Sequence, residues 1–271
     1  MPKKYLRKII SSGLYPLTSV WEKHRRADTM RILAYHRVNN DVHGDRLSVS
    51  TDNFRAQMEF LKSAGYETLL IDEWLEARRQ DTDFSRKIAI TFDDGYADNV
   101  TGALPVLQEA GFRAIFFLAT GFIGSDNLVP RYLNWEGNHS WMSWDQARSL
   151  VAAGMQVGAH SVNHVKVGHV DINEAEVEIV TCRSDLLENH LPADWFAYPA
   201  GSFSAPVVEL VRSTGFKGAV TMLPGANSRG EYEYLLKRTE VSGDDSLFDF
   251  RKKLVGAYDL QHKCAHYWNQ R

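Results

Sequence analysis

The sequence predicts an α/β protein, a closed or nearly closed barrel of parallel strands surrounded by helices. Short β-rich runs alternate with longer amphipathic stretches from residue 31 onward, and several of those stretches end in glycine, as helix C-termini commonly do. Seven or eight such units fit into roughly 210 residues, which favours a barrel over a short open sheet. The 271 residues, 44% of them hydrophobic, are enough to bury one large core.

The expected strands are runs rich in apolar and β-branched residues, at 31–36, 67–70, 87–92, 113–119, 155–160, 195–199, 217–220 and 236–241. Helical patterns lie between them, at 51–65, 71–79, 99–111, 143–154, 172–190 and 204–215. In the first helix we expect Thr51 as N-cap and Gly65 near the C-terminus. Residues 31–271 show no repeat and no linker, so we expect one domain there.

Residues 1–30 form a basic amphipathic extension. Tyr5, Leu6, Ile9, Ile10 and Leu14 recur at helical spacing among lysines and arginines. Such a helix is predicted to touch an anionic membrane surface through residues 1–26, or else to pack on the domain. No stretch resembles a signal peptide or a membrane span, so we expect a cytoplasmic protein, peripheral at the inner membrane surface.

The charge and the cysteines exclude two classes of protein. The net charge is −3, and no Lys/Arg stripe interleaves with aromatic residues, so no nucleic-acid partner is expected. Cys182 and Cys264 show no CxxC spacing, so neither a disulfide framework nor a cysteine metal site is indicated.

The run AITFDDGYAD places two carboxylates, Asp93 and Asp94, at the end of an apolar strand. Neighbouring carboxylates repel, and a fold that presents them together offsets the repulsion with a cation or a shared proton; the alternative is a solvated turn. In a β/α barrel, the strand ends converge on the face where active sites lie. By this rule His36, His160 and the Tyr198-Pro199 pair join the two aspartates.

His160 and His164 lie four residues apart just after an expected strand. If the chain turns helically there, both imidazoles fall on one face and can bind one metal ion. Two histidines and one carboxylate leave coordination positions open for water, as in a catalytic zinc-type site. Chance spacing among the ten histidines is the alternative.

TFDDG, then HSVNH, then FAYPAG resemble the polysaccharide deacetylase (NodB-like) family, carbohydrate esterase family 4, and most closely its exopolysaccharide or poly-N-acetylglucosamine branch. The resemblance spans residues 31–245. It implies a distorted (β/α)7 barrel that removes N- or O-acetyl groups from N-acetylhexosamine-containing polysaccharides or their lipid-linked precursors. It also implies one divalent metal ion, zinc above all, with cobalt, nickel or iron as alternatives.

The resemblance also implies a role for each motif residue. Asp94, His160 and His164 correspond to the metal ligands, and Asp93 to the general base that activates a metal-bound water. A backbone N–H in the turn Tyr198, Pro199 and Ala200, above all that of Ala200, would hold the oxyanion.

This sequence departs from the family pattern at the remaining motifs. An arginine-containing motif appears here as Ala197-Tyr198-Pro199-Ala200-Gly201, and the late leucine-histidine motif is absent, since the last histidines, His262 and His266, lie in a polar tail. We therefore expect His36 to be the general acid, which its neutral-range titration would suit; a structural histidine is the alternative. Arg238 and Asp245 are expected as orienting groups or as ordinary salt-bridge partners.

The loop 121–144 is rich in aromatic residues. Tyr132, Trp135 and Trp141 would stack on sugar rings, or else pack the loop onto the barrel.

Three competing functions remain open from sequence. Two histidines and a carboxylate also bind ferrous iron in oxygenases, although on antiparallel β folds. A sugar-binding pseudoenzyme would fit the missing motifs, but it needs no free base beside a metal. A deacylase or deformylase of a lipid- or nucleotide-linked sugar would fit the expected location. The oligomeric state is not indicated.

Overall fold

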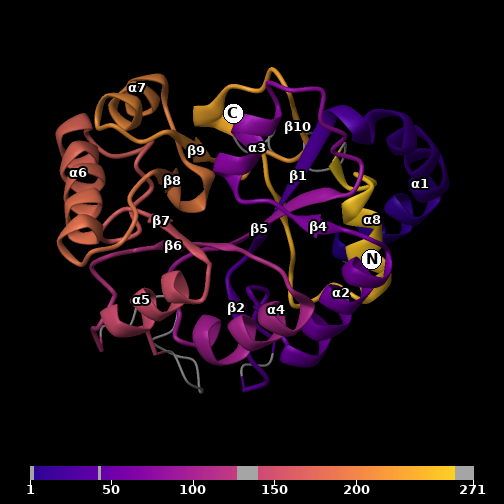
Figure 1. Ribbon diagram of the computed structural model, residues 1–271, viewed down its shortest axis with the longest axis horizontal. Helices are drawn as coiled ribbons and strands as arrows, with labels where there is room; N and C mark the ends of the chain where they lie inside the picture. Colours follow the sequence, from indigo (N-terminus) through magenta and orange to yellow (C-terminus); the bar gives the residue numbers. More distant parts are fainter. Residues whose placement is uncertain (1–2, 42–43, 127–139, 260–271) are drawn as a thin grey trace.

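The structure, a computed structural model, describes residues 3–41, 44–126 and 140–259 (Figure 1). Parallel strands form its centre, in the order β1, β5, β6, β7, β8 and β9. The bounds of these strands are Thr29–Tyr35 (β1), Lys87–Phe92 (β5), Ile115–Leu118 (β6), Gln156–Ala159 (β7), Trp195–Ala197 (β8) and Gly218–Val220 (β9). The predicted parallel α/β architecture is confirmed.

One segment, residues 236–240, joins the two ends of this sheet. The amide of Leu236 donates to Ala219 O at 3.0 Å, and Thr221 N donates to Leu236 O at 2.8 Å, beside β9. Three residues further on, β11 (Thr239–Glu240) pairs in parallel with β1. In the described part of the chain the sheet thus curls into a distorted barrel of seven strand positions.

Four shorter strands lie at the margins. Glu67–Thr68 (β4) pairs with the start of β5, and Asn227–Ser228 (β10) pairs antiparallel with the start of β1. Arg37–Val38 (β2) and Ser48–Val49 (β3) form a separate parallel pair. The expected strand at 67–70 is therefore a two-residue extension of the barrel wall.

Helices surround the barrel (Figure 1). Their bounds are Lys3–Arg25 (α1), Thr51–Ser63 (α2), Ile71–Ala77 (α3), Leu104–Ala110 (α4), Trp144–Ala152 (α5), Ile172–Glu188 (α6), Ala205–Ser213 (α7) and Leu247–Leu254 (α8), with a π-helical turn at Asn99–Ala103 and 3₁₀ turns at Arg26–Asp28, Pro199–Gly201 and Glu233–Leu235. The N-cap of α2 is Ser50 rather than Thr51, because the Ser50 hydroxyl accepts from Asn53 N. Every helix in the described ranges is too short or too polar to cross a bilayer.

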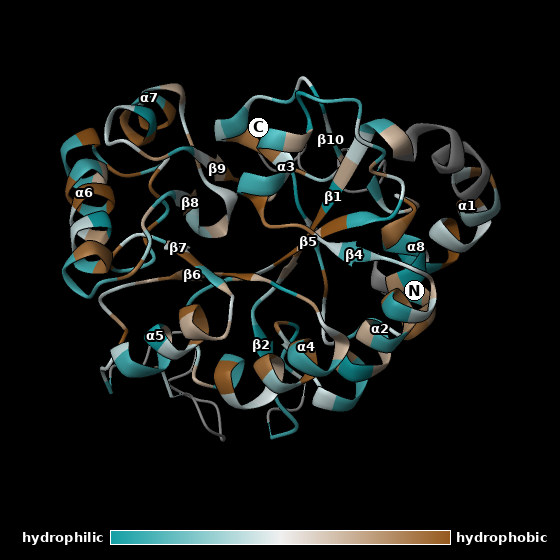
Figure 2. Ribbon diagram, viewed as in Figure 1, coloured by the Kyte–Doolittle hydropathy of each residue, from teal (hydrophilic) through white to brown (hydrophobic). Residues whose placement is uncertain are grey.

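Strand side chains alternate between two apolar clusters. Ile32, Ala89, Phe117 and Trp195 belong to a cluster inside the barrel, whereas their sequence neighbours pack against the helices. The apolar strands and the polar outer faces of the helices are visible in Figure 2. Because side chains alternate along a strand, this pattern also decides which polar residues at the strand ends point inward.

Candidate metal and catalytic site

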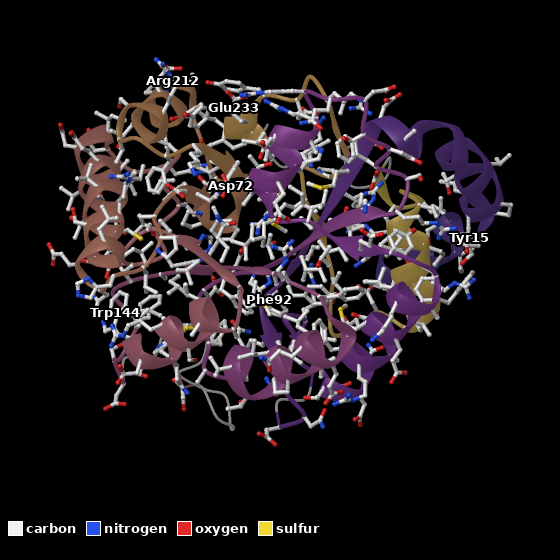
Figure 3. The ribbon with its side chains drawn as sticks, viewed as in Figure 1. Tyr15, Asp72, Phe92, Trp144, Arg212 and Glu233 are labelled. Atoms are coloured by element: carbon white, nitrogen blue, oxygen red, sulfur yellow. The ribbon has the colours of Figure 1, made fainter. Side chains whose placement is uncertain are left out.

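Asp93 lies one residue beyond β5, in the same alternation as the interior residues Ala89 and Thr91. Its amide donates to Tyr35 O at 3.0 Å, which continues the pairing between β5 and β1. Phe92, its neighbour, packs on the helix side and lies near the middle of the molecule (Figure 3). The Asp93 side chain is therefore directed into the end of the barrel, where it is 2% exposed.

Asp94 turns in a different direction because its backbone has a positive φ of 79°. The following Gly95 also has positive φ, and a Cβ there would lie 2.7 Å from the Ile123 side chain. The glycine thus permits a tight turn against a packed neighbour. The turn leaves Asp94 Oδ1 3.3 Å from Nε2 of both His160 and His164.

The orientation of the His160 ring is fixed by a contact with β8. Its Nδ1 lies 2.8 Å from the backbone oxygen of Ala197. A carbonyl only accepts, so Nδ1 donates the hydrogen and Nε2 is left facing the same point as Asp94 Oδ1, where a metal ion would lie between them. This backing bond is the arrangement that commonly orients metal-ligating histidines.

The His164 side chain reaches the same point although the chain does not turn helically between His160 and His164. The expectation that both imidazoles lie on one face of a helix is therefore wrong. Ser161 and His164 instead have positive φ of 60° and 55° in an irregular segment. Such backbone is strained and persists only where surrounding structure holds it. Together with Asp94 and Ala200, these residues account for four of the five non-glycine positive φ values in the described residues.

Glu178, on α6, holds this strained segment. Its carboxylate accepts from Val162 N at 2.9 Å and from Asn163 N at 2.8 Å, and also from Asn163 Nδ2 at 2.7 Å. Glu178 is 6% exposed, so its charge is balanced mainly by these three donors. Sequence analysis missed this residue; its position among apolar neighbours on the inner face of a predicted helix was the available signal.

The three side chains Asp94, His160 and His164 match the needs of a divalent metal ion. Their donor atoms all lie within 4.8 Å of one another. Two ligands of a tetrahedral zinc, each about 2.0–2.1 Å from it, are separated by about 3.3 Å, as Asp94 Oδ1 is from each histidine nitrogen. Asp94 Oδ1 is buried and has no hydrogen-bond partner among the described residues. The donors therefore fit a metal.

The charges of the site are strongly coupled. Burial alone would raise the pKa of Asp94, but the neighbouring His164 and His160 imidazoles outweigh it and hold that pKa well below its ordinary value. Burial lowers the pKa of His164, but the Asp94 carboxylate outweighs it and the net pKa is raised. The cluster thus keeps Asp94 ionised, the form that binds a metal.

Arg238 is the partner of Asp93. Its Nη1 and Nη2 each donate to one Asp93 oxygen at 2.7 Å, and its Nε donates to Thr221 O at 2.9 Å. The arginine is 1% exposed, and follows Leu236 in the interior alternation. Burial alone would raise the pKa of Asp93, but the Arg238 guanidinium outweighs it and lowers that pKa. Because Arg238 is buried, its ion pair with Asp93 is not an ordinary surface salt bridge.

Asp245 lies elsewhere. Its carboxylate accepts from Ser242 N at 2.7 Å and pairs with Lys253 of α8. These contacts brace the loop after β11 and include no group of the site, so the structure gives Asp245 an ordinary salt-bridge role.

His36 follows β1 and continues the interior alternation of that strand. Its backbone oxygen accepts from Asn99 Nδ2 at 2.7 Å, and its Nδ1 is buried without a hydrogen-bond partner in the described residues. β1 and β5 pair in parallel with Tyr35 opposite Phe92, so His36 lies next to Asp93 where the two strands end.

The turn after β8 presents Ala200 and buries Tyr198. Ala200 has a φ of 52° and is exposed, inside a turn closed by Gly201 N donating to Tyr198 O at 2.8 Å. Tyr198 alternates toward the helices, where it packs against Phe196 and Phe203, and burial raises the pKa of its hydroxyl. Its side chain is fully buried, so the turn can offer the site its backbone but not the Tyr198 side chain.

Trp141 is a packing residue with one edge on a cavity. It stacks between Tyr96 and Phe122, with ring centroids 4.6 and 4.7 Å away, and is 7% exposed. The cavity, about 500 Å³, is lined by none of the candidate site side chains, and its polar lining includes Arg37, Asn39, Asp98, Thr101 and Ser140. Tyr132, Trp135, His262 and His266 lie outside the described residues.

Comparisons with known proteins agree with this geometry. A family model described as polysaccharide deacetylase matches residues 80–219. YxkH of Bacillus subtilis, provisionally named a polysaccharide deacetylase, is 29% identical over 228 residues, which cover 83% of this chain and 76% of YxkH. The poly-β-1,6-N-acetyl-D-glucosamine N-deacetylase of Staphylococcus aureus is 21% identical over 207 residues, covering 73% and 69%.

Two solved structures share the fold. The deacetylase PplD of Streptococcus pyogenes, in complex with acetate, superposes with a TM-score of 0.71 at 21% identity, over 83% of this chain and 97% of PplD. IcaB of Ammonifex degensii superposes with a TM-score of 0.70 at 24% identity, over 86% and 98%. The similarity therefore extends over most of the barrel.

Proposed function

Since the chain belongs to the polysaccharide deacetylase family, we propose that it is a metal-dependent hydrolase. Its substrate is an N-acetylhexosamine-containing polysaccharide, or the lipid-linked precursor of one, from which it removes an N-acetyl or O-acetyl group. The observation that carries this proposal is the pairing of Asp93 with Arg238 directly beside the Asp94, His160 and His164 cluster. A carboxylate oriented by an arginine and placed next to three side chains suited to bind a metal is the arrangement that metal-assisted hydrolysis requires.

Asp94, His160 and His164 would hold the divalent ion, most plainly zinc because of the nitrogen-rich donor set. When bound, the ion supplies Lewis acidity toward the acetyl oxygen and makes a nearby water more acidic. Asp93 remains ionised because Arg238 lowers its pKa. It can therefore accept a proton from the attacking water, while the bidentate guanidinium fixes which carboxylate edge faces that water.

The other two roles fall to His36 and Ala200. Cleavage of an amide leaves a nitrogen that must gain a proton, and His36, next to Asp93 across the β1–β5 pairing, has a buried ring nitrogen without a hydrogen-bond partner in the described part of the chain. The exposed turn at Ala200 offers a backbone N–H to the developing oxyanion. The reaction consumes one water and yields acetate and a free amine, or a free hydroxyl when the acetyl is on oxygen.

A polar cavity lined by residues that follow His36 and Asp94 in sequence, Arg37 and Ala97 among them, supports a sugar substrate. Its size falls in the range of ligand pockets, and its lining combines an arginine, asparagines and hydroxyls with one aromatic edge. Such groups suit neighbouring sugar units of a chain. The Staphylococcus aureus relative is named for poly-β-1,6-N-acetyl-D-glucosamine, so we include oligomers of that polymer among the first substrates to test.

The test is an assay of acetate release by the full chain loaded with zinc, cobalt, nickel or iron, against N-acetylated oligosaccharides and lipid-linked sugars. We expect release with at least one metal, and loss of release in Asp93→Asn although this variant still binds metal. Asp83→Asn, an exposed carboxylate, is the control. Sugar binding without release in the wild type would establish a pseudoenzyme instead. Formate release from formylated sugars, with acetylated ones inert, would identify a deformylase.

A further inference from the structure

Helix α1 is docked on the domain by polar groups. Lys8 Nζ donates to Asp249 Oδ2 at 2.7 Å and to Asp244 O at 2.8 Å. Lys252 of α8 donates back to Lys8 O and to Ser12 Oγ. Ser11 is fully buried beneath the helix. The side of α1 that faces the protein is therefore held mainly by hydrogen bonds and ion pairs.

The outward side of α1 is apolar. Ile9, Ile10 and Leu17 are 55%, 43% and 71% exposed, with Gly13 and Pro16 between them also exposed. At 100° per residue these five positions cover one continuous stripe of the helix. This reverses the usual amphipathic arrangement, in which the apolar stripe faces the core. Ile9, Ile10 and Leu17 therefore present exposed aliphatic surface on the outward side of the helix.

Two residues of α8, next to the docked side of α1, are also partly exposed. Leu247 and Phe248 are 36% and 46% exposed. Tyr15 of α1, labelled at the edge of the molecule in Figure 3, packs edge-on against Phe248 with 5.4 Å between ring centroids. We name the outward residues Ile9, Ile10 and Leu17 the α1 apolar surface. It lies on the periphery of the barrel, where α1 and α8 are neighbours (Figure 1).

The charge around this surface identifies the occupant. Residues 1–26 contain seven lysines or arginines and one acidic residue, Glu22, a net charge of +6. The whole chain carries −3, so the remaining 245 residues carry −9. A strongly basic helix with an exposed aliphatic stripe, on an otherwise acidic protein, is complementary to an anionic lipid surface. An acidic protein partner would match the charge but not require Ile9, Ile10 and Leu17 to be exposed together.

We propose that the α1 apolar surface rests on an anionic phospholipid bilayer, with Ile9, Ile10 and Leu17 in the interfacial layer and the net positive charge of residues 1–26 attracted to the headgroups. This binding goes beyond the proposed catalytic function and does not depend on it. It would hold the enzyme beside a substrate carried on that membrane.

The test is co-sedimentation of the full chain with vesicles of phosphatidylcholine containing about 30% phosphatidylglycerol, and with phosphatidylcholine alone. We expect binding to the anionic vesicles at least about tenfold tighter than to the neutral ones. Replacing both Ile9 and Leu17 by serine is expected to weaken it about tenfold. Because both side chains are exposed, circular dichroism and acetate release from a soluble oligosaccharide are expected to be unchanged.

A matched control replaces two comparably exposed apolar side chains on another helix. Val177 and Leu187 of α6 are 64% and 49% exposed, but that helix is rich in glutamate. Val177→Ser with Leu187→Ser is expected to leave vesicle binding within about twofold of wild type. The proposal is overturned if the anionic vesicles do not bind the wild type, or if Ile9→Ser with Leu17→Ser binds as wild type does. It is also overturned if sedimentation shows a dimer that this double variant dissociates.

Discussion

Arg238 holds both carboxylate oxygens of Asp93 at 2.7 Å, across 145 residues of sequence and inside the end of the barrel. The adjacent Asp94 faces two histidines instead. The two neighbouring carboxylates therefore avoid mutual repulsion by facing different cations. Asp93 pairs with the Arg238 guanidinium, and Asp94 faces the position that a metal ion would occupy.

Replacing Arg238 by alanine tests whether its ion pair with Asp93 lowers the pKa of Asp93 and orients it. In Arg238→Ala the cation that lowers the pKa of Asp93 is lost while the burial that raises it remains, so that pKa rises. We expect the acidic limb of kcat/KM to move to higher pH, kcat/KM to fall by about 10²-fold or more, and the free energy of unfolding to fall by about 3–5 kcal/mol.

Arg31→Ala provides the control for the loss of a buried ion pair, since Arg31 pairs with Asp259 near the opposite end of β1. It is expected to destabilise the protein without moving the acidic limb. An unchanged pH profile in Arg238→Ala would contradict the orienting role.

His160 tests the metal. The wild type is expected to retain about one divalent ion per chain after dialysis, and His160→Gln almost none, because a buried ligand braced by Ala197 is removed. Metal at about 100 times its Kd should also stabilise the wild type by about 2.7 kcal/mol, seen as a higher Tm, with no rise in the variant. His169→Gln, an exposed histidine bonded to Ser202, should behave as wild type. Equal metal content in both variants would refute the site.

Glu178 tests the support of the metal ligands. Glu178→Gln replaces a carboxylate that accepts three hydrogen bonds by a group with one acceptor oxygen, which loosens the strained segment carrying His164. We expect metal affinity to fall about 10- to 100-fold, measured by competition with a chelator. Glu174→Gln, exposed on the same helix, should leave it unchanged. Wild-type affinity in Glu178→Gln would show that the segment holds its shape by itself.

His36 tests the source of the returning proton. His36→Gln is expected to lower hydrolysis of an N-acetyl amide by about 10²–10⁴-fold. Hydrolysis of an activated aryl acetate, whose leaving group needs no proton, should fall far less. Metal content should not change. If both substrates lose activity equally, His36 serves the structure or an earlier step, and the acid is another group.

Asp249 tests the docking of α1. Burial alone would raise its pKa, but hydrogen bonds from Lys252 and Lys8 outweigh it and lower that pKa. A lowered folded pKa contributes stability above the unfolded value of about 3.9, and that contribution is lost as the pH falls further. Asp249→Asn is therefore expected to lower the free energy of unfolding by about 1–3 kcal/mol at pH 7.

At pH 3 that difference should shrink, as measured by urea unfolding at both values. Glu176→Gln, exposed on α6, should show little difference at either pH. A pH-independent difference for Asp249→Asn would mean that lost packing rather than lost charge is responsible.

The sequence by itself determined the order of strands and helices and most of the chemical groups. The apolar runs that end in Asp93-Asp94 and in His160 were enough to predict that these side chains lie together, because parallel strands bring their carboxyl ends to one face. The same reasoning could not tell whether the Tyr198 side chain points into the barrel or toward the helices, because a shift of one residue along a strand exchanges the two sides.

Only the tertiary structure decided the partners. Arg238 reaches Asp93 because the segment 236–240 closes the barrel between β9 and β1, a pairing that no local pattern encodes. His164 joins the cluster through positive φ angles held by Glu178, where sequence favoured a helical turn. Local propensity acts over a few residues, whereas these contacts depend on how distant elements pack, and the outward apolar face of α1 likewise follows from docking by Lys8 and Lys252.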